Sequence, residues 1–169
     1  MVQLLASNAR VDLVAEGADL AVRIGRAHAL DAHSRLLTPT DRWAVASPAY
    51  VASRGAPTLA ALDQHDLLAY SLADADADWT VVGDAGRERL RPTRVVEADS
   101  GDVLRGILKA GFGFAVLPHW LVEQDVSDGA LERVMADVAF PPSPTRALWL
   151  GTRHPPARVR AFVDWLAAA

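Results

Sequence analysis

The residues best suited to bind a ligand are Asp99, Ser100 and Gly101, which follow a short β-branched strand at 95–96 and open a helix. Asp99 or Ser100 can cap that helix, because their side-chain oxygens accept hydrogen bonds from its first N–H groups. The N–H groups that remain at the helix start favour anions. These three residues therefore predict a helix cap, a ligand contact, or both.

This helix belongs to a strand–helix–strand unit over residues 95–118. An apolar stripe at helical spacing predicts the helix, and Gly111 and Gly113 then turn the chain into an apolar strand at 114–117. A second strand reached through a short helix should run parallel to the first, with a right-handed connection. The helix start then lies at the carboxyl end of the first strand, where ligands bind in open α/β sheets.

Ser7 and Asn8 are candidate ligand contacts at the other end of the chain. They follow a predicted apolar strand at 2–6 and precede a predicted short helix at 11–17. Both residue types are good helix caps. Capping and ligand binding are therefore both open for these two residues, and one role does not exclude the other.

Arg23, Thr38 and Thr40 are the remaining candidates. Arg23 interrupts an otherwise apolar strand at 18–25, so it needs an anionic partner, either a ligand or a carboxylate such as that of Asp19. Thr38 and Thr40 lie in a segment that leads into the next strand, where their hydroxyls could hydrogen-bond a ligand. A purely structural role explains the two threonines equally well.

Several enzyme-like patterns fail when their spacing is checked. The 99–101 triplet has no His–Asp context for a serine nucleophile, and the aspartates at 74–78 lack the glycine and closing glutamate of a calcium loop. His28 and His33 have no helical spacing and no carboxylate motif for a metal. The glycines at 111–113 precede a strand, unlike those of a dinucleotide site. We predict no enzyme activity, no metal and no cofactor.

Length and composition narrow the function further. The chain has 169 residues, of which 51% are hydrophobic, so it can bury a core as one domain or two small lobes. A net charge of −4 argues against nucleic-acid binding by this chain itself. The absence of cysteine, of a signal peptide and of a long apolar run indicates a cytoplasmic protein without a membrane partner.

The remaining pattern alternates short strands and helices, which predicts an α/β fold. Beyond the segments already named, strands are predicted at 43–46, 67–71, 79–82, 131–135 and 147–150, and helices at 48–54, 59–62, 120–124 and 156–168.

Six segments, taken in order, resemble the effector-binding domain of LysR-type transcriptional regulators, a bacterial family with the type 2 periplasmic-binding-protein fold. Together they cover nearly the whole chain, whereas any one of them alone would be weak evidence for the resemblance. They are VDLVAEGADLAVRIG (11–25), ASPAYVASRGAPTLAAL (46–62), HDLLAY (65–70), AGFGFAVLPHWLV (110–122), GALERVM (129–135) and RVRAFVDWL (158–166).

The resemblance implies two α/β lobes joined by two crossover strands, with a small-molecule effector, anionic or aromatic, held in the cleft. Lobe one would comprise residues 1–37 and 148–169, and lobe two residues 38–147. In such regulators, effector binding alters a dimer or tetramer and the way attached helix-turn-helix domains engage DNA. The family pattern also places the helix at 103–110 at an oligomer interface.

The sequence departs from the family pattern at its start. The helix-turn-helix and the first strand and helix of lobe one have no counterpart, so we expect an N-terminally truncated domain. Loss of that central strand would leave the strands at 2–6 and 20–24 without their shared neighbour. Two alternatives stay open, namely a stand-alone solute-binding or small-molecule enzyme domain of the same fold, and a non-functional remnant.

Overall fold

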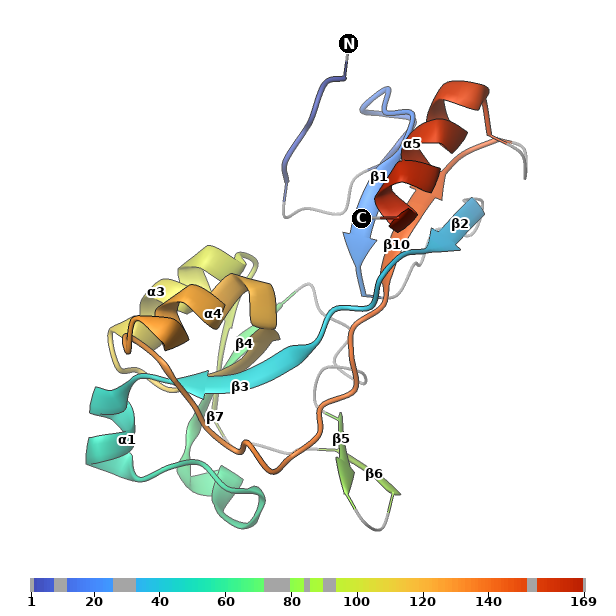
Figure 1. Ribbon diagram of the computed structural model, residues 1–169. Helices are drawn as coiled ribbons and strands as arrows, with labels where there is room; N and C mark the ends of the chain where they lie inside the picture. Colours follow the sequence, from blue (N-terminus) through green and yellow to red (C-terminus); the bar gives the residue numbers. More distant parts are fainter. Residues whose placement is uncertain are drawn as a thin grey trace. The chain divides into compact units, whose positions relative to one another are not determined.

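A computed structural model describes residues 2–7, 12–25, 33–71, 80–83, 86–89, 94–151 and 155–168. The chain divides into two units (Figure 1). Unit 1 comprises Met1–Thr40 and Pro144–Ala169, and unit 2 comprises Asp41–Ser143. Each unit packs helix against β-sheet, so the predicted α/β class is confirmed.

Unit 1 contains three antiparallel strands in the order β1–β10–β2. They are β1 (Ala21–Ile24), β10 (Thr145–Trp149) and β2 (His33–Leu36). Helix α5 (Ala157–Ala168) covers one face of this sheet, where Val159 and Val163 pack with Ala147 and Trp149. The predicted amphipathic C-terminal helix is thereby confirmed.

Unit 2 contains a five-stranded mixed sheet in the order β7–β4–β8–β3–β9. Its strands are β7 (Arg94–Ala98), β4 (Asp66–Tyr70), β8 (Phe114–Pro118), β3 (Arg42–Ala46) and β9 (Glu132–Arg133). Strand β4 is parallel to β7 and β8, whereas β3 is antiparallel to β8 and β9. A hairpin pairs β5 (Thr80–Gly83) with β6 (Gly86–Arg89), and β5 agrees with the strand predicted at 79–82.

Apolar cores fill both faces of the unit 2 sheet. Helices α3 (Gly101–Lys109) and α4 (His119–Ser127) lie side by side over one face (Figure 1). The core beneath them consists of Val45, Leu68, Leu104, Leu108, Ala115, Leu117, Val122 and Leu131. Helix α1 (Pro48–Arg54) and the 3-10 helix η1 (Leu59–Gln64) belong to the other face. The second core consists of Ala44, Ala46, Tyr50, Leu62, Leu67, Val81, Phe114, Val134 and Met135.

The predicted strand–helix–strand unit is confirmed as β7–α3–β8. Both strands run parallel to β4, which lies between them. Gly111 has a φ of +84°, a left-handed conformation that favours glycine and ends the helix. Gly113 has a different function: a Cβ at this position would overlap the backbone carbonyl oxygen of Asp66. Its missing side chain therefore lets the start of β8 approach β4.

Two elements predicted at the N-terminus are wrong. Residues 2–7 form no strand, and Leu4 is 83% exposed, because no described strand pairs with this segment. The predicted helix at 11–17 is a single turn that ends at Gly17 with a φ of +60°. The Asp12 carboxylate accepts hydrogen bonds from the Val14 and Ala15 N–H groups. So short a segment cannot offset the cost of helix nucleation without tertiary packing.

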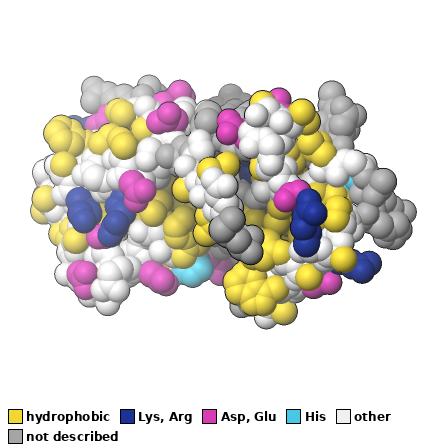
Figure 2. All heavy atoms as spheres, turned by 90° about the horizontal axis from the view of Figure 1, so that it is seen from above, with side chains coloured by type: hydrophobic (Ala, Val, Ile, Leu, Met, Phe, Trp, Pro, Cys, Tyr) yellow, Lys and Arg dark blue, Asp and Glu magenta, His cyan; other side chains and the backbone are white. Residues whose placement is uncertain are grey.

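Two predicted strands are shorter or more exposed than expected. The apolar strand predicted at 18–25 shrinks to β1, and Val22 is 53% exposed, because β1 has a described neighbour on one edge only. The strand at 131–135 shrinks to β9 and is followed by Met135 with a φ of +51°. Hydrophobic side chains, drawn in yellow, are exposed on the face of the molecule shown in Figure 2.

The acidic loop at 74–78 and His28 lie outside the described residues. No helix in the described part of the chain is long and apolar enough to cross a membrane.

Candidate functional site

Three parallel strands of unit 2 end at the same edge of the sheet. Strands β7, β4 and β8 run in one direction, so their carboxyl ends at Ala98, Tyr70 and Pro118 lie along one edge. The Ser71 N–H donates a hydrogen bond of 2.8 Å to the Ala98 carbonyl, which ties the first two ends together. Polar residues that follow these strands are thus brought into one neighbourhood.

The predicted residues Asp99, Ser100 and Gly101 lie at this edge, where α3 begins. Ser100 is the N-cap, and its Oγ accepts a hydrogen bond of 3.4 Å from the Val103 N–H. The Asp99 side chain is exposed. A Cβ on Gly101 would lie 2.8 Å from Leu121 Cδ2, so this glycine also lets α3 pack closely on the first turn of α4.

The N-terminus of α4 lies at the same edge and was not predicted as part of the site. Pro118 is its N-cap and supplies no side-chain hydrogen bond, and the His119 N–H donates to the Asp41 carbonyl at 2.9 Å. Because the N–H groups at a helix start carry partial positive charge, two adjacent helix starts favour an anion or a hydrogen-bond acceptor. The signal in the sequence that could have predicted this helix start was the proline directly after the apolar strand at 114–117.

Aromatic and charged side chains flank the start of α4. The Trp43 ring lies 5.7 Å from the His119 ring, and the Arg133 guanidinium lies 4.5 Å from the centre of Trp43. His119 Nε2 is 3.9 Å from a Glu123 carboxylate oxygen, whereas its Nδ1 is buried and has no hydrogen-bond partner among the described residues. This cluster adds stacking and charge to the edge, and sequence reasoning did not assemble it.

An ion cluster joins the two helices behind this edge. The Asp125 carboxylate, 4% exposed, accepts hydrogen bonds from Arg105 Nε, from Arg105 Nη2 at 2.9 Å and from Lys109 Nζ at 3.2 Å. The Arg105 hydrogen bond lowers the pKa of the Asp125 carboxyl. The spacing of Arg105 and Lys109 on one helical face was visible in the sequence, but their partner on α4 was not. The cluster holds α3 on α4 and so keeps both helix starts in place.

The predicted residues of unit 1 are more scattered. Ser7 lies in the exposed segment 2–7, and Asn8 lies outside the described residues. Thr38 is exposed, whereas Thr40 is buried and its Oγ1 lies 3.0 Å from Thr145 Oγ1. Thr40 thereby connects the segment after β2 to β10, and a structural role accounts for it.

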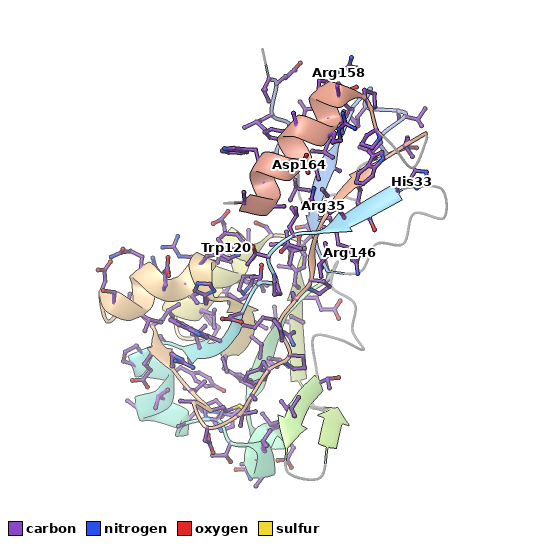
Figure 3. All side chains as sticks on the ribbon, turned by 45° about the vertical axis from the view of Figure 1, so that its right-hand side comes forward. His33, Arg35, Trp120, Arg146, Arg158 and Asp164 are labelled. Atoms are coloured by element: carbon purple, nitrogen blue, oxygen red, sulfur yellow. The ribbon has the colours of Figure 1, made fainter. Side chains whose placement is uncertain are left out.

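Arg23 lies in β1 directly opposite Arg146 of β10, and both side chains are half-buried. Arg146 Nη1 donates to Ser34 Oγ at 3.4 Å. The predicted carboxylate partner of Arg23, Asp19, is instead bound by Arg158 Nη2 at 2.9 Å. Figure 3 shows Arg158 on α5, whereas Arg146 lies on the sheet away from that helix.

A buried Tyr50–His65 pair lies in the second core of unit 2. The Asp66 N–H donates to the Tyr50 hydroxyl oxygen at 3.1 Å, and the same hydroxyl is hydrogen-bonded to His65 Nδ1 at 3.0 Å. Burial lowers the pKa of His65, and the Arg54 charge lowers it further. This pair belongs to the packing of the core and not to the strand edge.

The family comparison and the comparison with curated proteins both match nearly the whole chain. The model of the LysR substrate binding domain family matches residues 1–169. The transcriptional regulator PtxR of Pseudomonas aeruginosa is 31% identical over 170 residues, which cover 98% of this chain and 53% of PtxR. The chain spans about half the length of the curated relatives it matches.

Solved structures give the same result. The regulatory domain of CrgA, a LysR-type transcriptional regulator from Neisseria meningitidis, matches with a TM-score of 0.71 at 25% identity, over 92% of this chain and 76% of that domain. The effector domain of the regulator AmpR from Pseudomonas aeruginosa matches with a TM-score of 0.74 at 26% identity, over 96% and 77%. The predicted periplasmic-binding-protein-like fold is confirmed.

Proposed function

Because the chain belongs to the family of LysR substrate-binding domains, we propose that it binds a small-molecule effector and thereby controls the DNA binding of a bacterial transcriptional regulator. The family match over residues 1–169 is the observation that carries this proposal. DNA contact would come from a helix-turn-helix domain, not from this acidic chain.

The carboxyl edge of the unit 2 sheet is our proposed contact for a polar or anionic group of the effector. Ser100 and Gly101 open α3 there, Asp99 precedes them, and the start of α4 lies alongside. In unit 1 we propose contacts from the residues that the sequence singled out, namely Ser7, Asn8, Arg23, Thr38 and Thr40. We also propose that residues 1–37 plus 148–169 form one lobe and residues 38–147 the other; these bounds differ from those of the two units by a few residues at each crossover, so Thr38 and Thr40 belong to unit 1 but to the second lobe.

Regulation needs only a difference in effector affinity between two states of the domain. We propose that the states differ in a homodimer or tetramer to which α3 contributes. Two exposed apolar side chains support that role, namely Val103 near the start of α3, which is 51% exposed, and Phe112 just after its end, which is 66% exposed.

The relatives are transcriptional regulators, which are not enzymes. We therefore propose that this chain has no catalytic activity and needs no cofactor. The same relatives support a cytoplasmic location.

Thermal-shift screening of small anionic and aromatic metabolites tests the binding step, with isothermal titration calorimetry of each hit. We expect an effector with a micromolar Kd. At 100 times its Kd it would stabilise the domain by about 2.7 kcal/mol. If no compound stabilised the folded chain, the ligand-sensing function would be contradicted.

A pair of matched cap variants tests the site. Ser100→Ala and Ser47→Ala each remove a helix cap, since Ser47 Oγ accepts from the Tyr50 N–H at the start of α1. Both should lose about 1 kcal/mol of stability. Only Ser100→Ala should weaken effector binding, because α1 follows the antiparallel strand β3 and starts at the opposite sheet edge. Equal affinities would remove Ser100 from the site.

A further inference from the structure

The cross-strand pair Arg23–Arg146 is the feature of unit 1 that its packing leaves unexplained. Strands β1 and β10 are antiparallel, and their register places the two arginines directly opposite each other. Side chains in this relation lie about 5 Å apart at Cβ. The neighbouring residue Ala147 packs in the α5 core, so Arg146 and Arg23 project from the other face of the sheet.

Neither arginine is paired with a carboxylate among the described residues. Two other arginines of unit 1 are neutralised: Arg35 bonds Asp164 of α5, as Figure 3 shows, and Arg158 bonds Asp19. Arg146 makes one hydrogen bond, to the Ser34 hydroxyl, and Arg23 makes none with the described part of the chain.

Two like charges directly opposite each other destabilise a sheet. Half-burial strengthens this repulsion, because less water screens it than at an open surface. An anion between the guanidinium groups would reverse the sign of the interaction. Guanidinium groups bind carboxylate and phosphate oxygens through paired N–H donors, and the Ser34 hydroxyl, which accepts from Arg146, can donate its own proton to an anion.

We propose that Arg23 and Arg146, with Ser34, form a binding site for the oxyanion of a small molecule, a carboxylate or a phosphate. The site deepens the proposed function, on which it rests, because it makes the effector an oxyanion and adds Arg146 and Ser34 to the contacts predicted from the sequence.

Titration of the full chain with sodium succinate and with inorganic phosphate tests the site, with sodium chloride at matched ionic strength as the reference. At least one oxyanion should raise the Tm above the chloride reference, and the two titrations show which chemistry is preferred. Arg23→Gln and Arg146→Gln should each weaken that binding at least tenfold. Arg160→Gln, on the exposed side of α5, is the matched control and should bind as the wild type does.

Stability without any oxyanion separates a binding role from a structural one. Each Gln variant should then unfold at a higher Tm than the wild type, because the repulsion is removed. A lower Tm for both variants, or oxyanion affinity equal to that of the wild type, would overturn the proposal. If a metabolite effector bound both variants with unchanged affinity, this site would be wrong while the ligand-sensing function stood. If the oxyanions bound here but no metabolite did, this site would stand and the ligand-sensing function would be wrong.

Discussion

The two units use their sheets differently. The five-stranded sheet of unit 2 has an apolar core on each face, whereas the described core of unit 1 lies on the α5 face of a three-stranded sheet. The charged side chains of the two units also differ in how they are paired. The buried Asp125 of unit 2 is matched by two cations, whereas Arg23 and Arg146 of unit 1 face each other. Among the described residues, unit 2 therefore has the larger apolar core and a neutralised ion cluster, whereas unit 1 has two arginines without a carboxylate partner.

Gly113→Ala should give the largest effect. The added Cβ would overlap the Asp66 carbonyl, a backbone group that cannot move without separating β8 from β4. We expect a loss of at least about 3 kcal/mol, measured by urea unfolding. Gly106→Ala in α3, where a Cβ meets no atom within 4 Å, is the control and should be neutral or stabilising by up to about 1 kcal/mol. Equal stability of the two variants would contradict the close approach.

Removal of the matched carboxylate should give the next largest effect. Asp125→Ala leaves Arg105 and Lys109 side by side without their anion, and we expect a loss of about 2 to 3 kcal/mol. Because Arg105 lowers the Asp125 pKa below its ordinary value of 3.8, this stabilisation is present above that pH and is lost as the pH falls through the lowered pKa. Unfolding curves of wild type and variant should therefore converge under acid conditions. A constant difference at every pH would show that the carboxylate charge is not involved.

His65 should make unit 2 sensitive to milder acid. Its lowered pKa means that the unfolded chain binds a proton more readily than the folded one. Stability is therefore full above pH 6.5 and declines below it, because burial and the nearby Arg54 charge disfavour the protonated imidazole in the folded chain. Urea midpoints at pH 7.5 and 5.5 measure the decline, and His65→Gln should flatten it. An unchanged slope in this variant would assign the decline to another group.

The smallest effect should come from the exposed edge of unit 1. Val22→Thr changes a side chain that is 53% exposed, so we expect a change within about 0.5 kcal/mol. Val163→Ala in the α5 core should cost about 2 kcal/mol. Hydrogen-exchange mass spectrometry of both variants would localise the effects. A large effect of Val22→Thr would mean that β1 is covered in solution and that the Val22 side chain is buried there.

Local patterns determined much of this protein. The helix that starts at Ser100, the turn at Gly111 and the parallel β7–α3–β8 unit follow from capping, glycine and apolar spacing, which act within a few residues. The six family-like segments predicted the fold class and the family, and the family match over residues 1–169 confirmed the family.

Tertiary structure alone decided which distant residues meet. The partner of Arg105 on α4, the approach of Gly113 to β4 and the register that opposes Arg23 and Arg146 depend on long-range pairing, which leaves no signal in either segment. The predicted strand at 2–6 was wrong for the same reason, since a strand needs a neighbour that local sequence does not specify. The local sequence sets which residues prefer a helix, a strand or a turn. Which charges are paired and which side chains are exposed depends on the residues that the fold brings next to them.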